Sequence, residues 1–169
     1  MAKKLNNDQR RATWPLFNPY LTMSSVEIKR IALEDPLYQK ERDLRNRILL
    51  RPIGIPDFGW EHNDKNSWHF VAIEDDEVIG CVVLVRLDEE ATKTQLIQMA
   101  VEREFQGRGI GRMLVEQLII FASENKVQEI QIHARDDVTA FYEQLGFETV
   151  GEPFDEVGIK HQHMLMALI

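Results

Sequence analysis

Hydrophobic residues recur along the chain at the two periods that are typical of strands and of helices. Residues 26–33 predict a strand, and residues 35–50 predict a helix that opens with an acidic cap and a proline. The runs WHFVAIED (68–75) and EVIGCVVLVRLD (77–88) meet at an acidic turn and predict a β-hairpin. A third run, TQLIQMAV (94–101), predicts the next strand.

The clearest helical pattern follows the glycine-rich stretch FQGRGIG at 105–111. Apolar residues then recur at steps of three and four, which predicts one buried helix face. The segment DDVTAFYEQLGF (136–147) predicts another helix, with Asp136 and Asp137 as caps and Gly146 as its end. The residues expected on the buried face of the first of these helices are Ile110, Met113, Leu114, Leu118, Phe121 and Ala122.

Two segments lack a regular pattern. Residues 1–23 mix charge, aromatic residues and prolines, and we expect an irregular arm ahead of a domain that spans 24–169. Residues 51–67 contain two prolines and two glycines, which predicts a long loop. Loops of this length in small domains are often functional, so an acceptor substrate could enter here.

Composition narrows the class of protein. A chain of 169 residues that is 44% hydrophobic suits one packed domain. A net charge of −8 argues against nucleic-acid binding and is compatible with a cationic small molecule. Cys81 is the only cysteine, which excludes an internal disulfide and a CxxC metal or redox site. This use of cysteine suits a reducing cytosol, and we expect a cytoplasmic protein with no metal. Because the chain has neither a membrane-length apolar run nor a secretion signal, we also expect no membrane partner.

The order of strand, glycine-rich loop and helix predicts an anion site. It brings unpaired helix amides and the positive end of the helix dipole to the glycines, and Arg108 and Arg112 add two cations. A Walker A loop would need a Lys and a Ser or Thr that this loop lacks. A dinucleotide-binding fingerprint counted from Gly107 would need a glycine where Arg112 stands, and it would open a βαβ unit rather than follow three meandering strands.

The remaining pattern, Q-x-x-G-x-G at Gln106, Gly109 and Gly111, closely resembles the pyrophosphate loop of the GNAT acetyltransferase superfamily. The segment from LIQMAV to HMLM, with RPIG and HFVA upstream, is similar to the ElaA/YjcF-like branch over about residues 26–168. The resemblance implies an α/β GNAT fold, in which helices flank both faces of a central, mixed and twisted β-sheet. It also implies transfer of an acetyl group from acetyl-CoA, the cosubstrate, to a primary amine by direct attack.

The resemblance also implies which residues bind coenzyme A. The strand before the loop would splay from its neighbour and pair its free backbone with the pantetheine arm, and the loop amides would face the pyrophosphate. Two positions depart from relatives, which weakens inference about the acceptor: Ile97 stands where this branch usually has Arg, and Arg135 where many members have Asn. The expected coenzyme-binding residues are Met99, Ala100, Val101, Gln106, Gly107, Arg108, Gly109, Ile110, Gly111, Arg112 and Arg135.

Tyr142 has two interpretations. Its helical spacing alone predicts a core aromatic residue, whereas the resemblance implies that its hydroxyl protonates the departing thiolate. We favour the catalytic role.

The sequence does not identify a single residue as the general base. His161 is the first choice, because its segment EVGIKH resembles its counterpart in the ElaA/YjcF-like branch and because histidine titrates near neutral pH. Glu61, His62 or a water chain would serve nearly as well. His161 and His163 could also share a strand face and bind a metal, although no further ligand motif supports that. His69 and His133, in predicted strands, are interpreted as structural.

The sequence leaves two other functions open. A non-catalytic acyl-CoA-binding sensor would keep the loop without the chemistry, and an NAD-binding oxidoreductase is disfavoured by the displaced third glycine. A protein lysine, a polyamine, an amino sugar and a peptide N-terminus remain candidate acceptors, and a homodimer remains one candidate assembly.

Overall fold

The computed structural model describes residues 25–168, so the predicted arm at 1–23 lies outside the described residues. Within this range the strands are β1 (Glu27–Ile31), β2 (Ser67–Glu74), β3 (Glu77–Arg86), β4 (Lys93–Val101), β5 (Glu129–Arg135), β6 (Glu148–Thr149), β7 (Phe154–Glu156) and β8 (Ile159–Ala167). They form one sheet in the order β1-β2-β3-β4-β5-β8-β6, and β7 also pairs with β8. The β4–β5 pair is parallel and the others are antiparallel, so the sheet is mixed as predicted.

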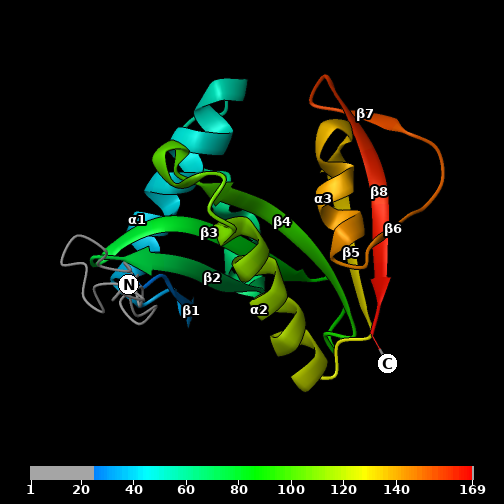
Figure 1. The fold of residues 1–169 in the computed structure, drawn as a ribbon, viewed down its shortest axis with the longest axis horizontal. Coiled ribbons are helices and arrows are strands. Elements are labelled where there is room, and N and C mark those ends of the chain that lie inside the picture. The colour runs from blue at the N-terminus through cyan, green and yellow to red at the C-terminus, as the bar shows by residue number, and fades with distance from the viewer. Residues whose placement is uncertain (1–24, 169) are drawn as a thin grey trace, which may run out of the picture.

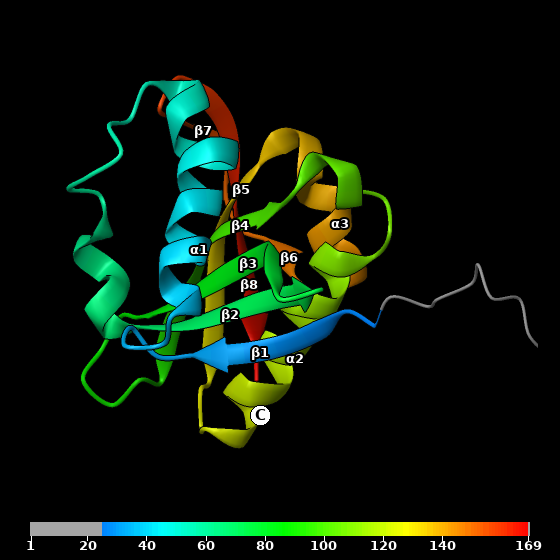
Figure 2. The same cartoon turned by 90° about the vertical axis from the view of Figure 1, so that its left-hand side faces the viewer.

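Helices cover both faces of the sheet (Figure 1, Figure 2). Helix α1 (Leu37–Arg45) lies on one face, whereas α2 (Ile110–Glu124) and α3 (Thr139–Gln144) lie on the other. Successive side chains of β2 point to opposite faces of the sheet and contribute to both hydrophobic cores. Phe70 packs in the cluster under α2, and Val71 packs in the cluster under α1. The predicted α/β arrangement, a mixed sheet with helices on both faces, is therefore confirmed. None of the helices in residues 25–168 has the length and apolar character needed to cross a membrane.

The local predictions are confirmed where a short-range signal controls the backbone. The β2–β3 hairpin turns at Asp75 and Asp76, whose φ angles of 49° and 63° are those of a tight primed turn. The Asp35 carboxylate accepts a hydrogen bond from the Leu37 N–H at 2.9 Å, as expected of a cap.

Three local predictions need correction. The predicted loop at 51–67 is partly helical, because α1 continues through a π-helical turn (Asn46–Leu50) into a 3-10 turn (Arg51–Ile53), and a second 3-10 helix covers Glu61–Asn66. Asp136 and Asp137 do not cap α3, because a 3-10 turn occupies that position and α3 begins at Thr139. On α2, Met113 is exposed and Val115 takes its place in the core.

Strands β4 and β5 are paired over only part of their length. Pairing runs from Lys93 opposite Glu129 to Leu96 opposite Ile132, and the rest of β4 has no pairing with β5 among the described residues. On its other edge β4 carries a bulge against β3, where Gln98 adopts a φ of 49°. A bulge bends its strand, and this one accompanies the separation of β4 from β5. The sheet is thus open between its two middle strands.

Candidate active site

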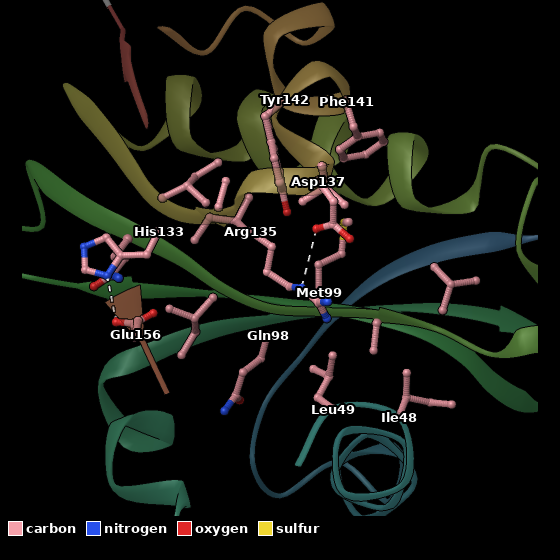
Figure 3. A pocket seen from close by; sticks show the side chains of 18 of the residues that line it. Ile48, Leu49, Gln98, Met99, His133, Arg135, Asp137, Phe141, Tyr142 and Glu156 are labelled. Atoms are coloured by element: carbon pink, nitrogen blue, oxygen red, sulfur yellow. Dashed lines mark hydrogen bonds and ion pairs between the residues drawn. The ribbon is translucent and has the colours of Figure 1, made fainter. Parts of the chain in front are cut away.

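A cavity of about 1020 Å³ occupies the gap between β4 and β5 (Figure 3). Residues from both faces of the sheet line it. Ile132 and Ala134 of β5 belong to the core under α2, so His133 between them points to the α1 face. The lining includes Met99, Gly107, Phe141 and Tyr142 on the α2–α3 side, and Ile48, Leu49, Gln98, His133 and Glu156 on the α1 side. Two molecules could therefore approach one point from opposite faces.

The glycine loop leads directly into α2. Gly107 and Gly109 both have a φ of +79°, a conformation that residues with a Cβ rarely adopt, and Gly109 immediately precedes the helix. No heavy atom lies within 4 Å of where a Cβ would stand at either glycine. The first amides of a helix have no intrahelical acceptor, and the loop just ahead of those of α2 lines the cavity at Gln106 and Gly107. This geometry can bind an anion.

The two predicted cations lie beside the loop and already contact carboxylates. Arg108 pairs with Glu74 at 3.1 Å, and the Arg112 Nε pairs with Glu116 one helical turn away at 2.7 Å. Neither arginine lines the cavity. Their contribution to anion binding would be electrostatic and would compete with these ion pairs.

The end of β4 is tied to the loop. Met99, Ala100, Val101 and Gln106 all line the cavity, and the Gln106 amide donates a hydrogen bond to the Val101 carbonyl at 3.0 Å. The expectation that Val101 offers free backbone to a ligand therefore needs correction for its carbonyl, which Gln106 already occupies. The Ile110 side chain is buried in the core, which leaves its backbone to contribute.

Tyr142 combines both interpretations made from the sequence. Its ring is buried edge-to-face against Phe141 and Phe147, with centroids 5.0 and 5.8 Å away. It also lines the cavity, and its hydroxyl points toward the side of the gap where Arg135 and Asp137 lie (Figure 3). Burial raises the pKa of Tyr142 to about 12, so the hydroxyl keeps its proton at neutral pH and can donate it.

Arg135 lies at the end of β5 and lines the cavity below Tyr142 (Figure 3). Its Nε is 3.5 Å from the Asp137 carboxylate, and both side chains are largely exposed. A weakly held guanidinium at the mouth of the gap could contact an incoming phosphate or an acceptor.

The structure places His161 away from the cavity lining. Its ring is buried and stacks on Phe154 at 5.9 Å, and its Nδ1 bonds to the Ile159 carbonyl at 2.7 Å. Its Nε2 is 3.6 Å from Glu156. His161 can reach an acceptor only through Glu156, so its assignment as the base has no direct geometric support.

The two alternative bases in the long loop are also outside the lining, which includes neither Glu61 nor His62. Glu61 forms an ion pair with Arg42 and accepts a hydrogen bond from the Gly59 N–H. Burial alone would raise the pKa of Glu61, but backbone hydrogen bonds and Arg42 lower it instead. A carboxylate held in this way is a poor proton acceptor.

His133 and Glu156 line the cavity and are hydrogen-bonded to each other, with 3.1 Å between Nδ1 and Oε1 (Figure 3). From its position in a predicted strand, we interpreted His133 as structural. The alternation Ile132–His133–Ala134 was the available signal that His133 faces away from the core. Nothing in the sequence placed Glu156 beside it, because β7 reaches β5 only by pairing with β8.

A buried charged cluster lies behind the cavity on the α1 face. It contains Glu41, Arg45, Asp64 and His69, each at most 4% exposed, and Arg45 bonds to Gln98 at the cavity wall. Both ring nitrogens of His69 have partners at 3.0 Å, Glu41 and the Asp64 carbonyl, in agreement with a structural role. Within residues 25–168 no group of three His, Cys, Asp or Glu side chains could hold a metal ion.

Comparisons with known proteins agree with this geometry. The family model described as an acetyltransferase (GNAT) domain matches residues 59–168. The uncharacterized N-acetyltransferase YitI of Bacillus subtilis is 27% identical over 146 residues, which cover 83% of this chain and 94% of the relative.

Solved structures share the fold at lower sequence identity. Escherichia coli ElaA has a TM-score of 0.70 at 17% identity, over 83% of this chain and 99% of that chain. A GNAT family acetyltransferase from Elizabethkingia anophelis with acetyl-CoA bound has a TM-score of 0.64 at 22% identity, over 85% of this chain and 98% of that chain.

Proposed function

The chain belongs to the GNAT acetyltransferase family, and from this premise we propose that it transfers the acetyl group of acetyl-CoA to a primary amine by direct attack. One observation carries the proposal: the gap between β4 and β5 is bordered by the glycine loop just ahead of α2 and is lined by residues from both faces of the sheet. A donor that enters along the loop and an acceptor that enters beside α1 would meet there.

The coenzyme would occupy the α2–α3 side. Its pyrophosphate would bind the amides from Gly107 to Arg112, where the helix dipole favours negative charge. Its pantetheine arm would lie along Met99 and Ala100, where β4 has lost β5 as a partner, and its amides would pair as an added strand does. The relative from Elizabethkingia anophelis with acetyl-CoA bound supports this choice of donor.

The reaction would be a direct attack. The amine nitrogen adds to the thioester carbonyl carbon, a backbone amide near Ala100 or Val101 stabilises the oxyanion, and the carbon–sulfur bond then breaks. Tyr142 donates its proton to the leaving thiolate, because its pKa of about 12 keeps the hydroxyl protonated until the thiolate forms.

The acceptor would enter from the α1 face. Ile48 and Leu49 form an apolar wall there, and Gln98, His133 and Glu156 supply the polar groups. Such a mixture can hold an alkyl chain and orient one amino group at its end.

Thiol release tests the proposal. Wild-type protein is incubated with acetyl-CoA and spermidine, glucosamine, a lysine-containing peptide or a peptide with a free N-terminus, and the acetylated amine is identified by mass spectrometry. At least one amine should raise thiol release above the reaction without an amine. Release at background level with all four, together with tight coenzyme A binding by calorimetry, would instead support the acyl-CoA sensor.

A further inference from the structure

We propose that His133 is the catalytic group that takes a proton from the acceptor ammonium and that Glu156 positions it. This inference rests on the proposed acetyl transfer. His133 extends from β5 into the acceptor half of the cavity, and Glu156 comes from β7, which lies 23 residues later in the chain.

The hydrogen bond fixes which ring nitrogen can act. The His133 Nδ1 is 3.1 Å from a carboxylate oxygen of Glu156, and a carboxylate only accepts hydrogen bonds, so Nδ1 carries a proton. In the neutral ring Nε2 therefore has the free lone pair. Among residues 25–168, Nε2 has no hydrogen-bond partner, so it can accept a proton from a bound substrate. A carboxylate that orients an imidazole in this way also stabilises the imidazolium that forms.

The other histidines near the sheet are already engaged. His69 bonds through both nitrogens, His161 bonds to the Ile159 carbonyl, and the His163 Nε2 is 3.1 Å from the Gln131 side chain. None of these three lines the cavity. Of the histidines in the described part of the chain, only His133 lines the cavity.

Several charged or titratable groups surround the His133 ring. Glu156 contacts it from β7, and His163 packs edge-to-face from β8 with its centroid 5.7 Å away. Arg135 follows two positions later on β5 and lies on the same side of the strand, and His161 reaches Glu156 from β8. The segment of β4 that faces the cavity contributes uncharged residues, including Gln95, Ile97 and Gln98.

An ammonium nitrogen loses two protons when it becomes a secondary amide. His133 Nε2 takes the first before attack and later releases it to solvent. The second leaves the nitrogen as the tetrahedral adduct collapses, and the thiolate gains one from Tyr142, which is then reprotonated. The net products are the acetamide, the free thiol of coenzyme A and one proton.

The key variant is His133→Gln, with His62→Gln as a matched control outside the cavity. For spermidine, or whichever amine of the panel reacts fastest, kcat of His133→Gln should fall about 100-fold or more. The acidic limb of its pH profile should disappear, and its coenzyme A affinity and melting temperature should stay near those of wild type. Wild-type kcat, or an intact acidic limb in this variant, would overturn the proposal.

An experiment with a weakly basic amine distinguishes a role of His133 in proton removal from a role in acceptor binding. Trifluoroethylamine is mostly unprotonated at neutral pH and does not need a base before attack, so the defect of His133→Gln should largely disappear with it. An equal defect with both amines would mean that His133 binds or packs rather than accepting a proton. The absence of acetyl transfer by the wild-type protein would contradict the proposed function itself, a separate outcome.

Glu156→Gln tests the positioning role. The amide oxygen can still accept the hydrogen bond from Nδ1, but the negative charge that stabilises the imidazolium is gone. The acidic limb of kcat should therefore move to lower pH, with KM for acetyl-CoA unchanged. A limb at the wild-type position would show that Glu156 does not act through His133.

Discussion

Arg45 donates a hydrogen bond to the Gln98 side chain at 2.9 Å and thereby joins α1 to the bulge of β4. Arg45 is completely buried and also bonds to both carboxylate oxygens of Asp64, at 3.0 and 2.8 Å. Gln98 has a positive φ, a strained conformation that the surrounding structure must hold in place. The buried charges of α1 therefore help to shape the wall of the cavity.

Removal of this link should destabilise the fold. Arg45→Met leaves Asp64 buried without its cation and Glu41 with His69 as its remaining partner, and loss of one partner from a buried pair costs about 3–5 kcal/mol. Urea denaturation at pH 7 measures the loss in the free energy of unfolding.

The matched control for this prediction is Arg51→Met, which breaks the exposed Arg51–Asp57 ion pair. Its unfolding midpoint should stay close to that of wild type. Equal midpoints for the two variants would mean that the buried cluster contributes nothing to stability.

The same cluster should make stability depend on pH. Burial of His69 alone would lower its pKa, but the hydrogen bond and the charge of Glu41 outweigh burial and raise the pKa above 6.5. Stability from the imidazolium is thus fully present below pH 6.5 and is lost as pH rises through the folded-state pKa. The wild-type free energy of unfolding should fall on the alkaline side of pH 6.5.

In His69→Gln this part of the alkaline slope should be absent. Urea midpoints at half-unit steps from pH 6 to 9 give the comparison, and His62→Gln serves as the control that keeps the slope. Identical slopes in His69→Gln and wild type would show that His69 does not change protonation on folding in this range.

The sequence predicted the parts of the site that are local. The step pattern after residue 109 depends on α2 alone, and the acidic turn at Asp75 and Asp76 sets the β2–β3 hairpin. The glycine loop was recognisable because φ values of +79° at Gly107 and Gly109 require a specific residue type. In each case a few neighbouring residues determine the backbone.

Contacts between residues that are far apart in the sequence could not be predicted from it. The Glu41–His69 contact joins a helix to a strand 28 residues later, and His133 meets Glu156 across two strand pairings. A charged residue such as Arg45 in a helical pattern is ordinarily assigned to solvent, and here tertiary pairing buries it instead. The error at Asp136 and Asp137 has a local cause, since a 3-10 turn takes the place of the predicted cap.

The loop can be tested by adding a negative charge. Gly111 lies in α2 without a positive φ, and a Cβ there would meet Met99 and Phe141 at ordinary contact distances of 3.6–3.7 Å. Gly111→Ala should therefore fold and bind coenzyme A with little change. Gly111→Glu should abolish coenzyme A binding, because its carboxylate would lie where the phosphates bind and would repel them.

Calorimetric titration with coenzyme A compares these two variants, and circular dichroism confirms that both are folded. Arg112→Ala should weaken binding by about 1 kcal/mol or less, as expected for one exposed ion pair. Wild-type affinity in Gly111→Glu would show that the loop does not hold the phosphates.

Tyr142→Phe separates the two roles of this residue. The variant keeps the ring that packs between Phe141 and Phe147, and no hydrogen bond joins the hydroxyl to another residue in the described part of the chain. The melting temperature should therefore stay near that of wild type.

If the Tyr142 hydroxyl protonates the thiolate, kcat of Tyr142→Phe should fall about 100-fold. KM for acetyl-CoA should not change, because the thiolate exists only as the bond breaks. Since the pKa of Tyr142 is about 12, wild-type kcat should show no loss from its ionisation between pH 7 and 10. Steady-state kinetics over this range provide the test, and an unchanged kcat in Tyr142→Phe would leave Tyr142 with its packing role alone.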